Sequence, residues 1–349
     1  MSFDTNGSTL VVISGELWVC GKNDYGQLGV GHKEDVRTFT RIESEFTKLG
    51  IKQVKSGYTH SLVLTNSGEV YGAGNNQSFQ LGLHDNLNGS TTFIKLPIEN
   101  VQKVECSGNF CMAISENNLY IWGHIFKHQY GHYQFTMPTK IISTQYNEVY
   151  NIFSGSTSDQ TNFIIETNNG IFLSKKITHE DNLFVKLNLN NNYSTIDIKF
   201  NWDAILLLSK NLDGEINLHR YDWDMQKFKI EKDIKLNNPK IFANIFKTYI
   251  LNENSKDIIR FKPSHKNIIP YKDNMNLPTI INDIILGHEH IFYIMSDDKV
   301  YCKGRNNSYE LGLGHNLTIE HLVEHPFLSG KGLERYPKIN KVKNARSYI

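Results

Sequence analysis

Histidine and cysteine are the residue types in this chain that offer the most chemistry, and their spacing decides which chemistry is open to them. Three imidazoles four residues apart would form a set of metal ligands on a helix. His124, His128 and His132 have this spacing, but their segment shows no helical period, so we predict no metal site there. The four cysteines form no CxxC pair and fall in or beside apolar runs, which indicates buried thiols rather than disulfides. They are Cys20, Cys106, Cys111 and Cys302.

Other reactive patterns are absent from the sequence. Backbone amides at glycines can cradle a phosphate, but Gly29-Val30-Gly31 and Gly312-Leu313-Gly314 lack the third glycine of a dinucleotide fingerprint, and no GK[ST] occurs. There is also no GxSxG, no HExxH, and no cysteine with an obvious histidine partner nearby in sequence. We therefore predict no catalytic residues, no metal and no cofactor, and we interpret the glycine-rich stretches as structural turns.

The glycine-rich stretches belong to an internal repeat, the signature of solenoids, propellers and arrays. The pattern of Gly15–Gly31, GELWVCGKNDYGQLGVG, returns at Gly68–Leu83 and at Asp298–Gly314. A looser copy covers Asn118–His132. Each repeat unit contains short runs rich in Val, Ile, Tyr and Phe that end in Gly, Asn or Asp, which indicates strands joined by tight turns.

Seven units of this kind account for the whole chain. The third run of each unit has an anchor residue, and successive anchors lie 42 to 53 residues apart. The anchors are Trp18, Tyr71, Tyr120, Phe172, Asn217, Ile259 and Tyr301. We predict one all-β domain over residues 1–349, a seven-bladed β-propeller with four strands in each blade.

The two chain ends indicate how the ring closes. Residues 10–21 supply a second and a third strand with no obvious first strand before them, whereas 339–345 (INKVKNA) match a first strand with no second strand after them. We therefore predict that the C-terminal strand pairs with the N-terminal hairpin, which leaves no unpaired edge.

The combination of GELWVCG, NDYGQLG and the SGYTHSLVL of Ser56–Leu64 resembles the regulator-of-chromosome-condensation repeat. The founding member of that family is a seven-bladed propeller that acts as a nucleotide exchange factor for a small GTPase and docks on nucleosomes. The resemblance is clear in units one, two and seven, and it covers about half the chain. Lys175, Arg220 and Lys262 stand where the repeat glycine is expected in units four to six.

The resemblance implies a set of residues that face the partner. His60 and His290 each follow a glycine by three residues, a recurrence that is typical of a hydrogen-bonded structural histidine. In unit three, Cys111 is expected at the same position. The alternative, implied by the family, is that the loops at this position contact a GTPase. The residues of these loops are Tyr58, Thr59, His60, Asp203, His288, Glu289 and His290.

A second set comes from the long loops of neighbouring units. Units seven, one, two and three keep long loops after Gly304, Gly21, Gly74 and Gly123, and binding residues concentrate on loops of a rigid scaffold. We therefore expect partner contacts from Tyr25, Asn76 and Arg305.

Charge narrows the choice of partner only locally. The chain has 37 basic and 36 acidic side chains, a net charge of +1, which favours neither nucleic acid nor an acidic substrate as a general target. The segment from Lys331 to Arg346 is basic and is compatible with chromatin or with a solvated strand face. No signal peptide or membrane-spanning segment is evident, so we expect an intracellular protein, cytoplasmic or nuclear.

These observations favour a propeller without bond-making chemistry that docks a protein partner, with a small GTPase of the Ran or Rab type as the best candidate. The alternative is a guanine nucleotide exchange factor, and chromatin docking comes third. The family's exchange activity depends on a protruding hairpin inserted in the ring, and the unit lengths here show no obvious insertion.

Overall fold

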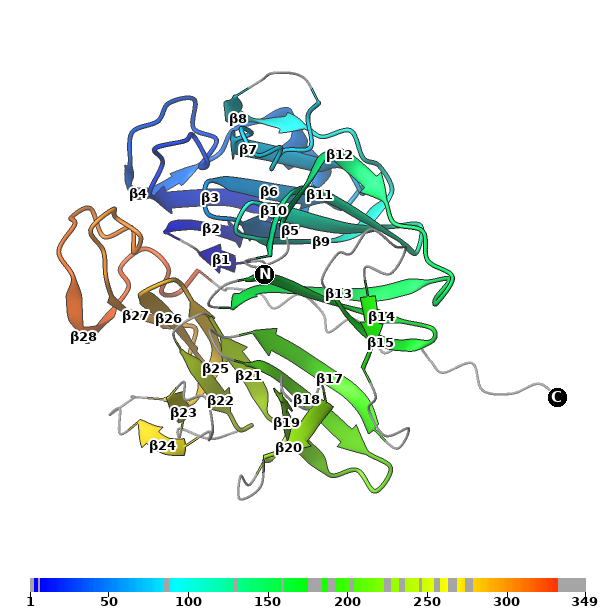
Figure 1. Ribbon diagram of the computed structural model, residues 1–349. Coiled ribbons are helices and arrows are strands. Elements are labelled where there is room, and N and C mark those ends of the chain that lie inside the picture. Colours follow the sequence, from blue (N-terminus) through cyan, green and yellow to red (C-terminus); the bar gives the residue numbers. More distant parts are fainter. Residues whose placement is uncertain are drawn as a thin grey trace.

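The computed structural model describes residues 3–5, 7–84, 88–127, 131–157, 160–174, 184–187, 193–200, 204–222, 227–231, 236–244, 247–253, 258–262, 269–273 and 279–331. Within these ranges the chain forms 28 strands and one short 3-10 helix, Glu45–Leu49. Seven antiparallel groups of four consecutive strands follow one another around a ring, with the N-terminus near its centre (Figure 1). The predicted seven-bladed propeller is confirmed.

The blades take their strands in chain order. Blades 1 to 3 contain β1 (Phe3–Thr5), β2 (Ser8–Ile13), β3 (Glu16–Gly21) and β4 (Val36–Arg41); β5 (Ile51–Ser56), β6 (His60–Thr65), β7 (Val70–Asn75) and β8 (Gly89–Lys95); and β9 (Val101–Ser107), β10 (Phe110–Ser115), β11 (Asn118–Lys127) and β12 (Gly131–Lys140). Blades 4 and 5 contain β13 (Val149–Thr157), β14 (Gln160–Thr167), β15 (Gly170–Ser174) and β16 (Phe184–Lys186); and β17 (Tyr193–Phe200), β18 (Ile205–Asn211), β19 (Ile216–Asp222) and β20 (Lys227–Ile230). Blades 6 and 7 contain β21 (Lys240–Ala243), β22 (Thr248–Leu251), β23 (Ile258–Lys262) and β24 (Ile269–Asp273); and β25 (Ile281–Leu286), β26 (His290–Met295), β27 (Val300–Gly304) and β28 (Ile319–Glu324).

The hydrophobic pattern of each strand follows from its place in the blade. The second strands β2, β6, β10 and β26 are buried along their whole length, because both of their faces pack against neighbouring sheets. Each predicted anchor of a third strand pairs with a residue of the second strand, as Trp18 does with Val11 and Tyr301 with Tyr293. The seven repeat units were therefore assigned correctly.

The closure of the ring differs from the prediction. The first-strand position of blade 1 is held by β1, where Phe3 pairs with Val11 and Thr5 with Thr9. The predicted closing strand, residues 339–345, lies outside the described residues, and the position it was expected to fill is occupied. The expectation failed because the three-residue strand FDT is too short and too polar to show a strand pattern.

The described seam between blades 7 and 1 is closed by packing and by hydrogen bonds between adjacent blades. The Thr9 hydroxyl donates to the Glu310 carbonyl at 2.6 Å, and the Gly314 amide donates to the Arg37 carbonyl at 3.0 Å. Strand β1 also contacts β25 of blade 7 and β5 of blade 2. Over the described residues, no helix is long and apolar enough to cross a membrane.

Candidate docking surface on the loop rim

One rim of the ring carries every predicted site residue that the structure describes. The strands of each blade are antiparallel, so two of its three connections lie on the same side of the ring. These are the connection from the first to the second strand and the connection from the third to the fourth. We call this side the loop rim; in blade 2 it consists of residues 57–59 and 76–88, and in blade 7 of 287–289 and 305–318. Asp203 lies outside the described residues.

Blades 7, 1 and 2, which we call the loop arc, have long loops after their third strands. These three loops share one internal support. The side-chain oxygens of Asn23, Asn76 and Asn306 accept from the backbone amides of Leu28, Leu81 and Leu311 at 2.8–3.0 Å. Their amide nitrogens donate to loop carbonyls, and all three asparagines are at most 2% exposed. The repeated NxxxxLG pattern therefore encodes a rigid loop, which confirms the structural interpretation of the glycine-rich stretches.

Three of the predicted contact residues point into the protein. Asn76 is 2% exposed, and His60 and His290 are 0% and 1% exposed. Both histidines pack against glycines, since a Cβ added at Gly57 or Gly287 would collide with the imidazole ring that follows it. This burial removes the three side chains from the candidate contact surface and supports the structural interpretation of the histidines.

The exposed members of the predicted set lie around the loop rim. Tyr25 and Tyr58 are 41% and 49% exposed. Thr59 is half-buried, and its carbonyl accepts from the Asn75 amide at 2.8 Å. Exposed aromatic side chains on a rigid loop are the usual anchors of protein interfaces.

Blade 7 contributes a charged pair to the same rim. The Arg305 guanidinium donates to the Glu289 carboxylate at 2.7 Å, and the Arg305 amide donates to the Glu289 carbonyl. The hydrogen bond from Arg305 lowers the pKa of Glu289. Both side chains are about half exposed, so they can exchange this mutual contact for contacts with a partner.

The mouth of the central channel opens on the loop rim as a cavity of about 310 Å³. Its lining comes from the first strands of blades 2 to 7 and includes Tyr58 and His288. Inside it, Lys55 and Glu105 form an ion pair at 3.0 Å. Burial alone would raise the pKa of Glu105, but Lys55 and Lys103 outweigh it, so the pKa is lowered and the carboxylate stays ionised.

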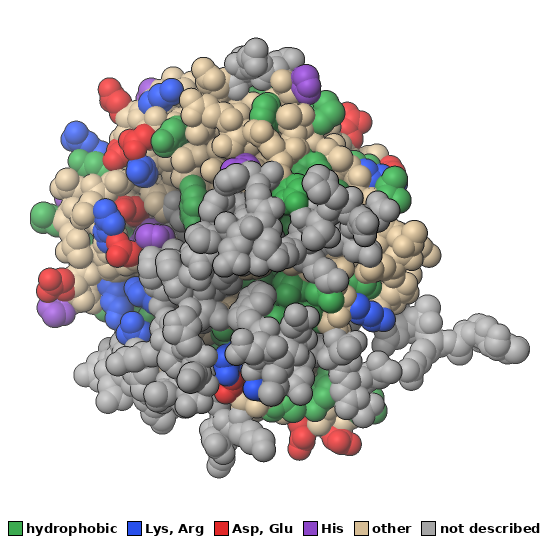
Figure 2. Space-filling model, in the orientation of Figure 1, with side chains coloured by type: hydrophobic (Ala, Val, Ile, Leu, Met, Phe, Trp, Pro, Cys, Tyr) green, Lys and Arg blue, Asp and Glu red, His purple; other side chains and the backbone are tan. Residues whose placement is uncertain are grey.

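A groove beside the channel, between blades 6 and 7, is rich in cationic side chains. Lys247, Lys303 and Arg305 line it together with Glu289. Burial and the neighbouring charges of Arg260 and Lys303 lower the pKa of Lys247. Figure 2 shows basic side chains, with acidic ones beside them, on the side of the molecule where β27 and β28 lie in Figure 1.

Blade 3 departs from the predicted long loop after Gly123. In place of an asparagine-anchored loop, β11 continues for four residues beyond Gly123 and pairs with β12, with His124 opposite Gln134 and Lys127 opposite Gly131. In the other blades of the clear repeat, the third strand ends at or next to the equivalent glycine. A β-hairpin therefore extends from the loop rim. Because this segment is a β-strand, the four-residue spacing of the histidines does not align them on one face as it would on a helix. His128 lies outside the described residues.

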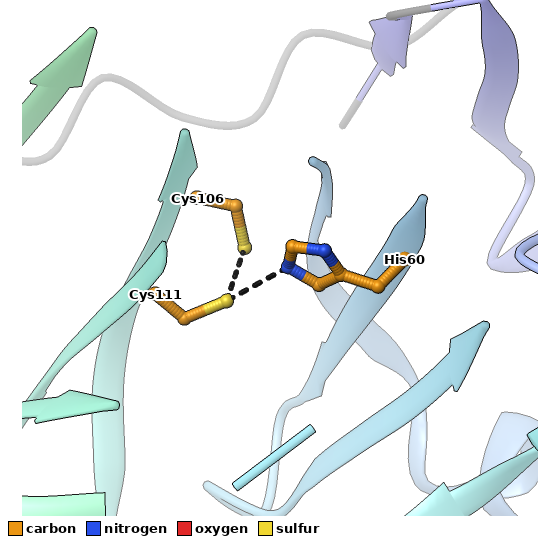
Figure 3. A group of neighbouring side chains, drawn as sticks. All are labelled: His60, Cys106 and Cys111. Carbon is orange, nitrogen blue, oxygen red and sulfur yellow. Dashed lines mark hydrogen bonds between the residues drawn. The ribbon is translucent and has the colours of Figure 1, made fainter. Parts of the chain in front are cut away.

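Sequence reasoning missed one cluster of reactive side chains between blades 2 and 3. The His60 Nε2 lies 2.9 Å from the Cys111 Sγ, which lies 3.1 Å from the Cys106 Sγ (Figure 3). Burial would raise the pKa of Cys111, but the hydrogen bond from Cys106 and the proximity of His60 lower it to about 6. The register explains the omission: Phe110, not Cys111, pairs with Gly123 as His60 pairs with Gly74.

Comparison with known proteins agrees with the repeat and with the fold. Residues 14–64 and 67–114 match the model of the regulator of chromosome condensation (RCC1) repeat, and 51–80 match a second model of this repeat. The chain is thus a seven-bladed β-propeller that carries RCC1 repeats.

Relatives share the repeat over part of their length. A 125-residue stretch is 36% identical to the secretion-regulating guanine nucleotide exchange factor of *Bos taurus*, and covers 34% of this chain and 26% of the relative. A 128-residue stretch is 34% identical to the protein RCC2 homolog of *Xenopus laevis*, and covers 36% and 25%. The chain therefore spans about a quarter of the length of these relatives.

Solved structures match over the whole ring. Prp20p of *Saccharomyces cerevisiae*, described with its binding properties to Gsp1p and histones, aligns with a TM-score of 0.68 at 16% identity, covering 93% of this chain and 87% of Prp20p. Human WBSCR16 aligns with a TM-score of 0.67 at 14% identity, covering 89% and 93%. At these identities the likeness concerns the fold.

Proposed function

We propose that this protein is a docking propeller that binds a protein partner, a small GTPase, through its loop rim. The names of its relatives support this class of partner: one is a guanine nucleotide exchange factor, and the structurally similar Prp20p is described with its binding to Gsp1p. Only the repeat and the fold are shared with them, so the residues of this rim have to carry the proposal.

The observation that carries it is the continuity of exposed polar and aromatic side chains around the channel mouth. Tyr58 and His288, from blades on either side of blade 1, line one cavity. Glu289, next to His288, and Arg305 line the adjoining groove. Aromatic and arginine side chains at the centre of a patch are the types that dominate binding energy in interfaces.

Charge favours an acidic element of the partner at the groove. Three cationic side chains, Lys247, Lys303 and Arg305, line it with two acidic ones, Glu289 and Glu320. Complementary charges at an interface steer association and fix its orientation. We expect the partner to place carboxylates over the groove and an apolar side chain against Tyr58.

The test is capture of a panel of purified small GTPases, in nucleotide-free and nucleotide-loaded forms, by the immobilised protein. The double variant Tyr58→Ala/Arg305→Ala should bind at least about tenfold more weakly, because each hot-spot truncation costs more than about 1 kcal/mol. The matched control is Ile142→Ala/Leu212→Ala, two side chains that are 84% and 80% exposed on the opposite rim. Capture of no GTPase, or equal loss in both double variants, would contradict the proposal.

A second candidate is nucleotide exchange, and the β11–β12 hairpin favours it. The family resemblance ties exchange to a hairpin protruding from the ring, and here Ile125 pairs with Tyr133 beyond the end of the usual third strand. Replacing residues 126–132 by Asn-Gly, a two-residue hairpin turn, shortens the hairpin and keeps the buried Ile125 and its partner Tyr133. If the protein is an exchange factor, this variant will still capture its GTPase but will release labelled nucleotide more slowly; equal release rates would leave docking as the whole function.

A further inference from the structure

We propose that His60, Cys106 and Cys111 form a binding site for Zn²⁺ between blades 2 and 3. The three side chains come from the start of β6, the end of β9 and the start of β10. Their donor atoms all lie within 4.8 Å of one another. Two thiols and one imidazole constitute a donor set that suits zinc.

The spacing of the donors allows an ion to enter with small side-chain movements. Tetrahedral zinc, with Zn–S of about 2.3 Å and Zn–N of about 2.0 Å, holds its sulfurs about 3.8 Å apart and sulfur and nitrogen about 3.6 Å apart. The observed separations are 3.1 Å for the two sulfurs and 2.9 Å for Cys111 Sγ and His60 Nε2. Each separation must therefore widen by less than about 1 Å.

The backbone holds the donors in place. Cys106 and Cys111 are directly opposite one another on β9 and β10, so neither can move away without breaking the ladder. His60 is fully buried, and the absence of a side chain at Gly57 makes room for its ring. Its Nε2 faces the sulfur of Cys111, whereas its Nδ1 has no hydrogen-bond partner among the described residues.

The site has an entry path from the channel mouth. Cys106 is only partly buried and lines the cavity at the channel mouth, whereas Cys111 and His60 lie behind it. Three protein ligands with access to solvent leave one position for water, as in open zinc sites. A zinc ion here would join blades 2 and 3 next to Tyr58 of the proposed docking surface.

The residues at the position of Cys111 in the neighbouring blades show which side chains this position needs for packing alone. Thr9 pairs with Cys20 as Cys111 pairs with Trp122, and Ser61 pairs with Ala73 at the same position. The Thr9 hydroxyl donates to the Glu310 carbonyl at 2.6 Å, whereas the Cys111 sulfur is 3.6 Å from the equivalent carbonyl of Gln80. A hydroxyl therefore suffices for the structural contact, and Cys111→Ser is a substitution that the fold accommodates elsewhere.

The experiment is a titration of the reduced full chain with Co²⁺, followed by displacement with Zn²⁺. We expect one equivalent of Co²⁺ to produce sulfur-to-cobalt charge-transfer absorption, and Zn²⁺ to abolish it. Cys111→Ser and Cys106→Ser should each weaken binding at least about tenfold. Cys20→Ser, which removes a buried thiol outside the cluster, should leave the titration unchanged.

A stability measurement guards against misfolded variants. Zn²⁺ should raise the melting temperature of the parent and of Cys20→Ser but not that of Cys111→Ser, because only a folded-state site stabilises on binding. The proposal is overturned if the reduced parent gives no charge-transfer band, or if the band survives in both Cys106→Ser and Cys111→Ser. It is equally overturned if mass spectrometry shows a Cys106–Cys111 disulfide that persists under the reducing conditions of the titration.

Discussion

The loop arc of blades 7, 1 and 2 and the opposite arc of blades 5 and 6 have the same topology but different interiors. One hydrophobic cluster crosses all three blades of the loop arc, from Phe292 and Leu311 through Leu10 and Leu28 to Val63. Other buried residues of blades 2 and 7 belong to clusters shared with blades 3 and 6. Among the described residues of blades 5 and 6 the clusters are smaller, and one of them contains Leu206, Leu218 and Ile250. The comparison teaches that the repeat motif brings a loop support and a core cluster that crosses three blades, whereas blades 5 and 6 form four strands each without the motif.

The two arcs also use glycine differently. Gly74 and Gly304 in the loop arc have positive φ and lie against the backbone of the preceding connection. In blade 5, Arg220 pairs with Leu206 in a regular ladder, and Gly214 lies in a tight turn where an added Cβ would meet only the Lys210 side chain, at 3.6 Å. A close backbone approach is therefore a property of the motif and not of the propeller fold.

The largest expected effect comes from adding a methyl group at these two kinds of glycine. At Gly74, with φ of 108°, a Cβ would collide with the Thr59 carbonyl and lie 2.7 Å from the His60 Cα. Gly74→Ala should lower the free energy of unfolding by about 3 kcal/mol or more, whereas Gly214→Ala should cost about 1 kcal/mol. Urea unfolding midpoints measure both. Equal costs would show that the motif glycine has no special role.

The next effect concerns the asparagine that supports each long loop. Asn306→Ala leaves the buried Leu311 amide and the His315 carbonyl without their partner, and should cost about 2 kcal/mol. Asn307→Ala, at the exposed neighbour, loses only a 3.3 Å contact with the Thr318 hydroxyl and should be almost neutral. Thermal unfolding of the pair tests this contrast, and a neutral Asn306→Ala would remove the loop support from the account.

A third effect should appear as a pH dependence, small near neutral pH and growing as the pH falls. Burial, with the nearby charges of Lys247 and His288, lowers the pKa of His290 from 6.5 to about 3. Between these values the unfolded chain binds a proton that the folded chain does not, so stability is complete above pH 6.5 and falls toward pH 3. One such histidine contributes up to about 1.4 kcal/mol per pH unit.

The variant His290→Phe isolates this contribution, because blade 3 holds Phe110 opposite Gly123 at the same register. Its free energy of unfolding should change less steeply with pH between 6 and about 4 than that of the parent. Parallel curves for the two proteins would show that His290 does not resist protonation in the folded state.

Much of the fold could be predicted from the sequence because turns and buried second strands leave strong local signals. Every third-strand anchor from Trp18 to Tyr301 was placed in its strand, even Asn217, which pairs with Ser209 in a blade without the motif. Strand β1 was not predicted, because a strand of three residues is too short to show an alternating hydrophobic pattern. The hairpin beyond Gly123 was not predicted, because it has about the length of the loop that was expected at this position.

The rim on which a candidate residue lies follows from the strand order, but the exposure of its side chain does not. The connections after the first strands lie on one rim, since antiparallel topology fixes the side. Whether a side chain on that rim points outward depends on neighbouring blades: Tyr58 is exposed, whereas His60, two residues later, is buried against blade 3. The cysteine cluster depends on the same packing between blades, and only an exact register would have revealed it.

The most direct test of docking on the loop rim is hydrogen exchange of the protein alone and in complex with the small GTPase that it captures most tightly. The account predicts protection of residues 57–59, 287–289 and 305–318 on binding, with unchanged exchange at the turn 212–214 on the opposite rim. Protection confined to that turn and to the other connections of the opposite rim would contradict it.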